Sequence, residues 1–351
     1  MNNDRIQEIL DLMEEARLDY FLISDPQSIA YCTGYYNDPH ERMFVFMISK
    51  HGNHTLFMND LFYLDHDLDV NIVWHKDGQD AIQTIVDEMH FPGRIGIDKN
   101  WASHFLLDLM KKLPDAKYIN ASPCVDLVRM KKDLQEQVLM IESSKINDAV
   151  MEEIIPFIQE DVTEKQLAKK LDELFFNHHS ICYGAIVAFG KNAADPHHEN
   201  DDTLLRKGDC VLIDMGCVYK GYCSDMTRTF FYEGILEEEI KVYEIVKKAN
   251  EAAEAMIKPG VKLSDIDKCA RKVISDEGYG KYFTHRLGHF IGRDVHEYGD
   301  VSSVNEMEVE EGMIFSIEPG IYLEGNFGVR VEDLVMVTKD GCQVLNSFTK
   351  D

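Results

Sequence analysis

VLIDMGCVYKGYCSDMTRTFF, at residues 211–231, is the stretch that decides the fold. Two runs of apolar and β-branched residues flank a glycine-containing turn, a pattern that predicts a β-hairpin. With the turn centred between Tyr219 and Lys220, Asp214 and Asp225 face each other with Cβ atoms roughly 5 Å apart. Two carboxylates this close repel, so one stays protonated unless a cation binds between them. The hairpin therefore predicts a divalent metal site.

A second hairpin is predicted from IFSIEPGIY at residues 314–322 and GVRVEDLVMVT at residues 328–338. Its turn is centred on Gly325, which places Glu318 opposite Glu332. A single acid in a strand usually faces water. Two facing pairs embedded in apolar strand residues are poorly explained by solvation, so the second pair supports the metal interpretation.

His289, in HRLGHFIGRDVHE at residues 285–297, adds a nitrogen ligand to the acids. Four carboxylates and one imidazole form a hard, oxygen-rich donor set, which favours Mn²⁺, with Co²⁺ or Zn²⁺ as alternatives. Five ligands are too many for one catalytic ion and suit two ions about 3.5–4 Å apart. The predicted metal ligands are Asp214, Asp225, His289, Glu318 and Glu332.

The composition excludes several classes of function. Lys+Arg total 36 and Asp+Glu total 63, which gives a formal net charge of −27 over 351 residues. Such an acidic surface repels phosphate backbones and anionic lipid, so nucleic acid and membrane partners are not expected. No segment approaches the ~18 consecutive apolar residues of a membrane span, and the N-terminus lacks the pattern of a signal peptide. The eight cysteines form no CxxC pair and are typical of reduced, mostly buried thiols, so we expect a cytoplasmic protein.

Two domains are predicted from the order of helix and strand signals. Residues 1–125 alternate strands with helices, which indicates an α/β domain with partly parallel pairing. Residues 126–351 show two helices followed by a carboxylate-bearing hairpin, and then the same order again. This repeat predicts a pseudo-symmetric α+β domain. The boundary is placed around Pro123.

Five ordered motifs resemble those of the pita-bread metallopeptidases (family M24), the superfamily of methionine aminopeptidases and Xaa-Pro peptidases. They are IDMG, SDMTRTF, HRLGHFIGRDVHE, IEPGIY and GVRVEDLVMVT. Residues 1–125 resemble the smaller α/β N-terminal domain of creatinase and prolidase type, which the Xaa-Pro branch carries. The resemblance therefore covers nearly the whole chain. It implies a C-terminal pita-bread (creatinase/aminopeptidase-like) catalytic domain and a homodimer.

The resemblance also implies a role for each metal ligand. Asp214 is expected to chelate one metal, Asp225 and Glu332 to bridge both, and His289 with Glu318 to complete the other. A hydroxide held between the two metals is expected to attack the scissile carbonyl. Glu318 is further expected to pass a proton to the leaving imino nitrogen.

Catalytic roles are implied for three histidines. His197 matches the histidine before the first hairpin that contacts substrate near the leaving group, whereas the adjacent His198 is the weaker match. His296 is expected to contact the substrate and to help stabilise the oxyanion. His285 and His296 flank His289 in a glycine-containing segment that predicts a loop over the site.

Four further residues are predicted to bind or position substrate. Tyr322 and Arg330 match positions that line or brace the centre, and a structural ion pair is an equally good interpretation of Arg330. Arg293 stands where the family commonly has an apolar residue, and is either a solvated loop charge or a cation directed at a substrate carboxylate. His40 belongs to YYNDPHER at residues 35–42, which resembles a loop of bacterial Xaa-Pro dipeptidases that reaches the partner subunit's active site.

The resemblance implies a metal-dependent Xaa-Pro dipeptidase (prolidase) that acts on small Xaa-Pro peptides. The alternative is an Xaa-Pro aminopeptidase, which has the same chemistry and accepts longer peptides. A metal-free hydrolase of creatinase type, or a non-catalytic binding protein on the same fold, is less favoured. Those relatives typically lose metal ligands, whereas all five are present in this sequence.

Overall fold

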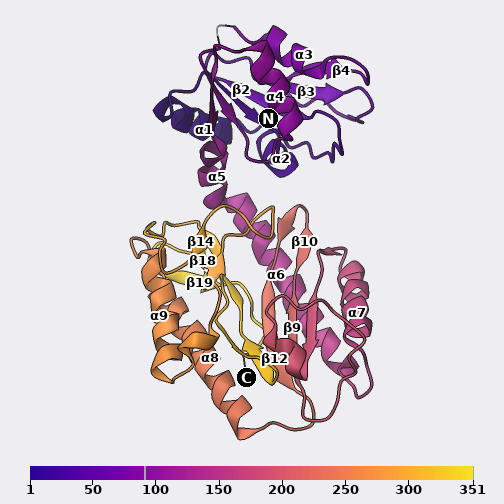
Figure 1. Cartoon of the computed structure of the whole chain (residues 1–351), viewed down its shortest axis with the longest axis vertical. Coiled ribbons are helices and arrows are strands. Elements are labelled where there is room, and N and C mark those ends of the chain that lie inside the picture. The colour runs from indigo at the N-terminus through magenta and orange to yellow at the C-terminus, as the bar shows by residue number, and fades with distance from the viewer. Residues whose placement is uncertain (91, 351) are drawn as a thin grey trace. The chain divides into compact units, whose positions relative to one another are not determined.

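The structure is a computed structural model that describes residues 1–90 and 92–350. The chain forms two compact units, Met1–Arg129 and Met130–Asp351 (Figure 1). Phe91 and Asp351 lie outside the described residues, and Asp351 is also the last residue of the second predicted domain. Both units combine helices with strands, as the sequence predicts.

A six-stranded mixed sheet forms the centre of the N-terminal unit, in the order β4-β3-β2-β1-β5-β6. The strands are β1 (Tyr20–Ile23), β2 (Val45–Ser49), β3 (Thr55–Asn59), β4 (Asn71–His75), β5 (Arg94–Ile97) and β6 (Lys117–Asn120). β1, β5 and β6 run parallel, as do β3 and β4, whereas β2 is antiparallel to both of its neighbours. The predicted partly parallel pairing is confirmed.

Five helices accompany this sheet: α1 (Asn3–Glu15), α2 (Pro26–Thr33), α3 (Ala81–Glu88), α4 (Ser103–Lys112) and α5 (Ser122–Met130). The sequence predicts helices at residues 4–19, 80–90 and 101–113, which correspond to α1, α3 and α4, but it predicts neither α2 nor α5. Asp25 caps α2 by accepting a hydrogen bond from the Ser28 backbone N–H at 2.8 Å. Pro123 lies in the first turn of α5, where a missing N–H costs nothing. The proline interpreted as a domain boundary is therefore a helix start.

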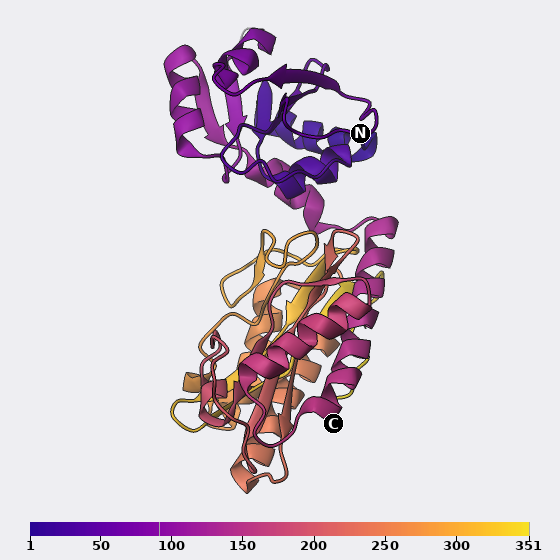
Figure 2. The ribbon, with the colours of Figure 1, turned by 90° about the vertical axis from the view of Figure 1, so that its right-hand side faces the viewer.

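The second unit contains two pairs of long helices. They are α6 (Leu134–Ile154) with α7 (Glu164–Asn177), and α8 (Glu237–Met256) with α9 (Leu263–Asp276). The helices of each pair pack on one another, and Figure 2 shows α6 and α7 side by side in magenta. α6 ends as the chain enters a 3₁₀ turn, Ile155–Phe157, that contains Pro156.

Each helix pair is followed by a carboxylate-bearing hairpin, which confirms the predicted repeat. After α7 come β7 (Ile181–Cys182), β8 (Ile186–Phe189), β9 (Cys210–Met215), β10 (Cys217–Tyr219), β11 (Tyr222–Cys223) and β12 (Met226–Phe231). After α9 come β13 (Gly288–His289), β14 (Asp300–Val301), β15 (Ile314–Ile317), β16 (Gly320–Leu323), β17 (Phe327–Arg330), β18 (Asp333–Val337) and β19 (Cys342–Val344).

The first hairpin closes one residue later than predicted. Its turn is Lys220–Gly221, both with positive φ (49° and 83°), between the paired residues Tyr219 and Tyr222. These are the dihedrals of a two-residue hairpin turn that favours glycine at its second position. In this register Asp214 pairs with Thr227. The prediction that Asp214 lies directly opposite Asp225 is therefore wrong.

The second hairpin has the predicted register. Leu323 pairs with Phe327 around Gly325, whose φ is +74°. Gly320 pairs with Arg330, and Ile317 pairs with Asp333. Between these two pairs the same register places Glu318 opposite Glu332. One continuous register therefore runs from β15–β18 through β16–β17.

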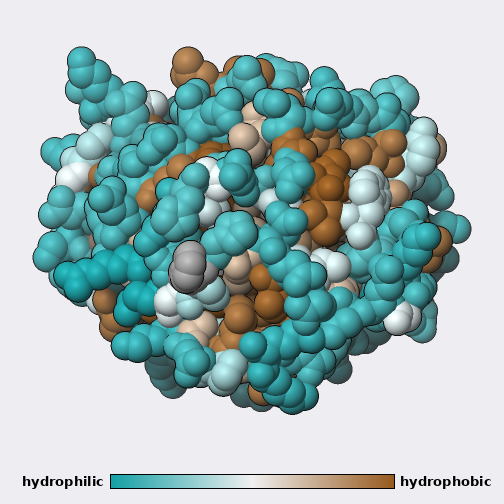
Figure 3. Space-filling view, turned by 90° about the horizontal axis from the view of Figure 1, so that it is seen from above, coloured by the Kyte–Doolittle hydropathy of each residue, from teal (hydrophilic) through white to brown (hydrophobic). Residues whose placement is uncertain are grey.

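Figure 3 shows one face of the molecule coloured by residue hydropathy. The face in Figure 3 is mostly hydrophilic, with small scattered apolar areas. Within residues 1–90 and 92–350, no helix is both long and apolar enough to cross a bilayer. All eight cysteines are unpaired, and five of them are buried. Burial raises the pKa of Cys223 well above its usual range, as expected for an inert core thiol.

Candidate active site

The two hairpins and the segment around β13 enclose a cavity of about 380 Å³ in the second unit. All five predicted metal ligands line it: Asp214, Asp225, His289, Glu318 and Glu332. So do the three predicted catalytic histidines, His197, His285 and His296. Residues more than 130 positions apart in the sequence therefore meet in one concave site. Their roles there remain predictions, which the local geometry supports as follows.

His289 lies between acids from both hairpins. Its Nε2 is 3.6 Å from Asp225 Oδ2 and 3.6 Å from Glu318 Oε1. Ligand atoms of Asp225, His289 and Glu332 all lie within 4.8 Å of one another. Separations of this size leave room for a cation between the groups, because oxygen and nitrogen ligands sit about 2 Å from a transition metal.

The ring of His289 is oriented for metal binding. Its Nδ1 lies 3.2 Å from the Phe290 carbonyl oxygen, to which only an N–H can donate. Burial, with a contribution from His296, lowers the pKa of His289 to about 3, so the ring is neutral. The single ring proton is thus on Nδ1, and the Nε2 lone pair faces the acids. A backbone carbonyl commonly fixes a metal-binding histidine in this way.

Buried acids in the cavity carry more negative charge than the protein compensates. Burial raises the pKa of Asp225 well above its usual range, and Asp214 and Glu318 raise it further. Burial, and next the charge of Asp225, also raise the pKa of Glu332 well above its usual range. Burial raises the pKa of Glu318 to about 7, although Arg330 opposes the shift. A divalent cation would supply the missing positive charge, so the donor set fits a metal centre.

Thr227 ties the acids of the two hairpins together. Its Oγ1 donates to Glu332 Oε2 at 2.7 Å and accepts from Arg330 Nε at 3.0 Å. Arg330 in turn forms an ion pair with Asp214, with Nη2 and Oδ2 2.6 Å apart. Arg330 is almost completely buried. Of its two sequence interpretations, the structure shows the ion pair, and the guanidinium also lines the cavity.

A second relay connects Arg330 to His285. Arg330 Nη1 donates to the Tyr322 hydroxyl at 3.1 Å, and this hydroxyl lies 2.8 Å from His285 Nε2. His285 Nδ1 is 2.7 Å from the Arg286 carbonyl oxygen. Burial lowers the pKa of His285 to about 4, so its one proton is on Nδ1 and Nε2 accepts from Tyr322. Tyr322 is buried and braces His285 and Arg330.

Two predicted substrate-binding residues lie elsewhere. Arg293 does not line the cavity, and its guanidinium lies 5.4 Å from the ring centroid of Tyr222. His40 belongs to the N-terminal unit, on an exposed loop with φ of +50°. Arg42 of that loop pairs with Asp77, which follows β4, at 2.9 Å. The partner-subunit role of His40 stays a prediction.

Among the residues of the site that the sequence does not predict are Tyr183, Thr227 and Arg286. Tyr183 and Arg286 both line the cavity, and Thr227 bridges the hairpins. Arg286 directly follows His285, so its position in the motif was the available signal. Thr227 lies two residues after Asp225 and therefore on the same strand face. Tyr183 carried no signal, because it lies in an irregular segment between two short strands.

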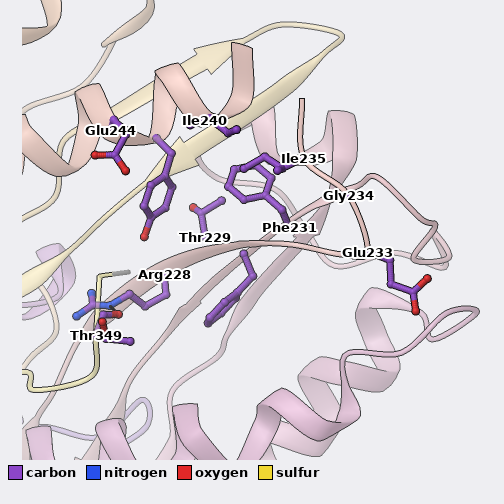
Figure 4. Close-up of a pocket in the computed structure, with 11 residues that line it drawn as sticks. Arg228, Thr229, Phe231, Glu233, Gly234, Ile235, Ile240, Glu244 and Thr349 are labelled. Atoms are coloured by element: carbon purple, nitrogen blue, oxygen red, sulfur yellow. Dashed lines mark hydrogen bonds between the residues drawn. The ribbon is translucent and has the colours of Figure 1, made fainter. Parts of the chain in front are cut away.

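A larger cavity of about 620 Å³ lies at the end of β12 and the start of α8 (Figure 4). Phe231, Ile235 and Ile240 lie close together on its wall in Figure 4. Arg228 also lines this cavity, but its guanidinium is engaged by Asp333 at 2.8 Å. Among the residues that the structure describes, no histidine or cysteine lines this space. This cavity is larger than the one that holds the acids and histidines, but its lining does not offer their chemistry.

A pseudo-symmetric α+β unit in which two hairpins supply four carboxylates and β13 supplies a histidine to one cavity defines a metal-dependent hydrolase of the pita-bread class. Comparison with known proteins agrees. The profile of Metallopeptidase family M24 matches residues 138–339, and that of the Creatinase/Prolidase N-terminal domain matches residues 5–131. The chain belongs to metallopeptidase family M24.

Relatives match along the full length of the chain. An uncharacterized peptidase of Staphylococcus aureus (strain MRSA252) is 34% identical, with 99% of each chain covered. The structure is similar to a dipeptidase from Pyrococcus horikoshii (35% identity, TM-score 0.91, 98% of each chain). It is also similar to a prolidase from Thermococcus sibiricus (32%, TM-score 0.91, 99% of this chain and 98% of that one). An X-Pro aminopeptidase from Thermotoga maritima is also similar in structure (29%, TM-score 0.85, 97% of this chain and 99% of that one).

Proposed function

We propose that this metallopeptidase is an Xaa-Pro dipeptidase that uses two divalent cations, with Mn²⁺ favoured over Co²⁺ and Zn²⁺. The observation that carries the proposal is the convergence of all five ligands and three histidines on one cavity of about 380 Å³. The similar structures named dipeptidase and prolidase support the substrate class. An Xaa-Pro bond lacks the N–H to which general peptidases hydrogen-bond. An enzyme that cleaves this bond therefore needs a cavity shaped for the proline ring.

The bound cations would supply Lewis-acid activation of water and of the scissile carbonyl. The residues of the chain perform the remaining work. Glu318, at the wall of the cavity, accepts the proton released by the attacking water and transfers it to the proline nitrogen as the C–N bond breaks. His285 presents a neutral ring held by Tyr322. His197 and His296 line the cavity, where they contact the substrate backbone and the developing oxyanion.

Arg286 is the residue we assign to the free carboxylate of a dipeptide. Its exposed side chain lines the cavity, and it makes no ion pair with any residue in 1–90 or 92–350. Its positive charge reaches the centre, because it contributes to lowering the pKa of both His289 and His296. A cation at the wall of a peptidase cavity stabilises a terminal carboxylate and favours dipeptides over longer peptides.

A panel of Xaa-Pro dipeptides and matched Xaa-Pro-Xaa tripeptides tests the proposal, with Mn²⁺, Co²⁺ and Zn²⁺ added separately. We expect faster hydrolysis of the dipeptides and the highest rate with Mn²⁺. Faster cleavage of the tripeptides would instead establish the Xaa-Pro aminopeptidase. Retention of full activity in EDTA, with no divalent ion in the purified protein, would contradict metal dependence.

The substitution Arg286→Ala is expected to raise KM for a dipeptide by about tenfold, with little change in kcat, because a charge-assisted hydrogen bond to a carboxylate is lost. Hydrolysis of the C-terminally amidated dipeptide should be unaffected. Arg293→Ala is the matched control, since Arg293 lies outside the cavity. An equal rise in KM in Arg293→Ala would instead indicate that Arg293 binds the carboxylate.

The loop containing His40 is proposed to close the active site of the partner subunit in a homodimer. Sedimentation velocity of the purified protein should give a dimer. His40→Ala should then raise KM, whereas a monomer with unchanged activity after His40→Ala would exclude this gating role.

A further inference from the structure

Glu164 is a completely buried carboxylate outside the metal cavity. It is the first residue of α7, and its two oxygens accept hydrogen bonds from four donors. Oε1 accepts from the Phe189 backbone N–H (2.9 Å) and from Asn192 Nδ2 (3.0 Å). Oε2 accepts from His198 Nε2 (2.6 Å) and from the Asp201 backbone N–H (3.0 Å). The four donors all lie between residues 189 and 201, so one carboxylate holds a whole segment.

His198 and its neighbour His197 have different surroundings. His197 lines the metal cavity. His198 is bonded to Glu164 and is absent from the lining of that cavity, but lines a separate open groove with Asn200. Because the two residues are adjacent, fixing the imidazole of His198 restricts the backbone from which the His197 ring projects.

Further contacts hold the same segment on both sides. His197 N–H donates to Asp195 Oδ1 at 3.1 Å. Asn200 accepts from the Val187 N–H at 2.7 Å and donates to the Ala185 carbonyl at 2.7 Å. These bonds attach the segment to β8 and to the residues just before it, and Ile186 of β8 also lines the metal cavity.

We propose that Glu164 and His198 form a positioning pair that holds His197 in place for peptide hydrolysis. The pair lies outside the cavity and touches neither substrate nor metal, so its effect acts through His197. This inference deepens the proposed function, since it relies on His197 contacting a peptide. It does not depend on whether that peptide is a dipeptide or longer.

Glu164, His198 and Asp201 also have ligand atoms close enough to hold an ion. Glu164 nevertheless has four N–H donors for its two oxygens, which accounts for its acceptor capacity. A cation there would have to displace those bonds in a completely buried position. The contacts therefore favour a hydrogen-bonded hub over a second metal site.

A double-mutant cycle separates positioning from general structural support. His198→Ala is expected to lower kcat by about tenfold to a hundredfold, since small displacements of a catalytic group have effects of this size. His198→Gln, which keeps an N–H donor for Glu164, should restore most of the rate. In a His197→Ala background, His198→Ala should cause no further loss, because it acts through the residue already removed.

Two controls accompany the cycle. Lys165→Ala breaks the exposed Lys165–Asp202 ion pair on the same helix and loop (2.9 Å), and should leave activity unchanged. Metal content and melting temperature are measured for each variant. The cycle uses whichever peptide the wild-type enzyme hydrolyses fastest, so failure of the Xaa-Pro dipeptidase proposal does not affect it.

A spectroscopic readout needs no activity at all. The ring resonances of His197 are assigned in a ¹⁵N-histidine spectrum by their loss in His197→Ala. They should shift in His198→Ala and in Glu164→Gln, while those of His40 stay in place. Additive losses in the cycle, or unmoved His197 resonances in both variants, would overturn the proposal.

Discussion

The two carboxylate-bearing hairpins place their acids by different means. In the second hairpin the register of β15–β18 continues through β16–β17 around Gly325, and this register places Glu318 opposite Glu332. In the first hairpin Asp214 pairs with Thr227. Asp225 lies two residues before Thr227, just outside the start of β12, and continuation of the strand register makes it a diagonal neighbour of Asp214.

The difference shows that the two acids of the first hairpin line the same cavity without lying directly opposite each other. Diagonal neighbours on one face lie roughly 7–8 Å apart at Cα and remain within reach of long side chains and of an ion between them. In the first hairpin, the position directly opposite Asp214 is used by Thr227, which bonds Glu332 of the other hairpin. The register of the first hairpin therefore places Thr227 where its hydroxyl can join the two hairpins.

The largest effect is expected from Asp225→Asn. Loss of this buried acid removes a proposed bridge between the two cations, so turnover should fall by at least about a hundredfold with little effect on folding. Steady-state kinetics, metal analysis and a thermal melt measure the three quantities. Asp202→Asn, at an exposed loop acid, is the control. Near-normal activity with two bound ions would refute the bridging role.

A smaller effect is expected from Thr227→Val, which preserves shape and removes the hydroxyl that joins the hairpins. Metal affinity should fall about tenfold to a hundredfold, as is typical when a partner of a metal ligand is lost. Ser316→Ala provides the comparison in the second hairpin, since Ser316 Oγ bonds Glu318 Oε1 at the longer distance of 3.2 Å. Competition with a chelator measures both affinities. If Ser316→Ala has the larger effect, the link through Thr227 is not the dominant support.

The smallest effects are expected from glycine substitutions that compare the two hairpins. A Cβ at Gly216 would lie 1.8 Å from the Tyr183 hydroxyl and 2.1 Å from the Ser224 carbonyl oxygen. Gly216→Ala should therefore destabilise the protein by about 1–3 kcal/mol. Gly325→Ala meets nothing within 4 Å, and only its φ of +74° is strained, so about 1 kcal/mol is expected. Urea unfolding measures both. Equal losses would mean that the first hairpin opens to accept the methyl group.

The sequence predicts more of the second hairpin than of the first because of turn chemistry. Gly325 lies between the paired residues Leu323 and Phe327, in a glycine-containing segment whose centre is easily identified, so the predicted register is confirmed. In the first hairpin the turn uses Lys220 at φ of 49°, and lysine carries no signal for a left-handed conformation. The predicted turn position is therefore wrong by one residue, and so is the predicted partner of Asp214.

The amino-acid sequence by itself determined the alternation of helices and strands (apart from α2 and α5), the repeat of helix pair and hairpin, and the set of acids and histidines that line the cavity. These features depend on local periodicity and on the order of motifs, both of which can be recognised in the sequence without knowing the fold. Only the tertiary structure decided that Arg330 pairs with Asp214, that Thr227 joins the hairpins, and that Arg286 rather than Arg293 lines the cavity. Such contacts join residues far apart in the chain, and they depend on which way each side chain points once both hairpins have closed.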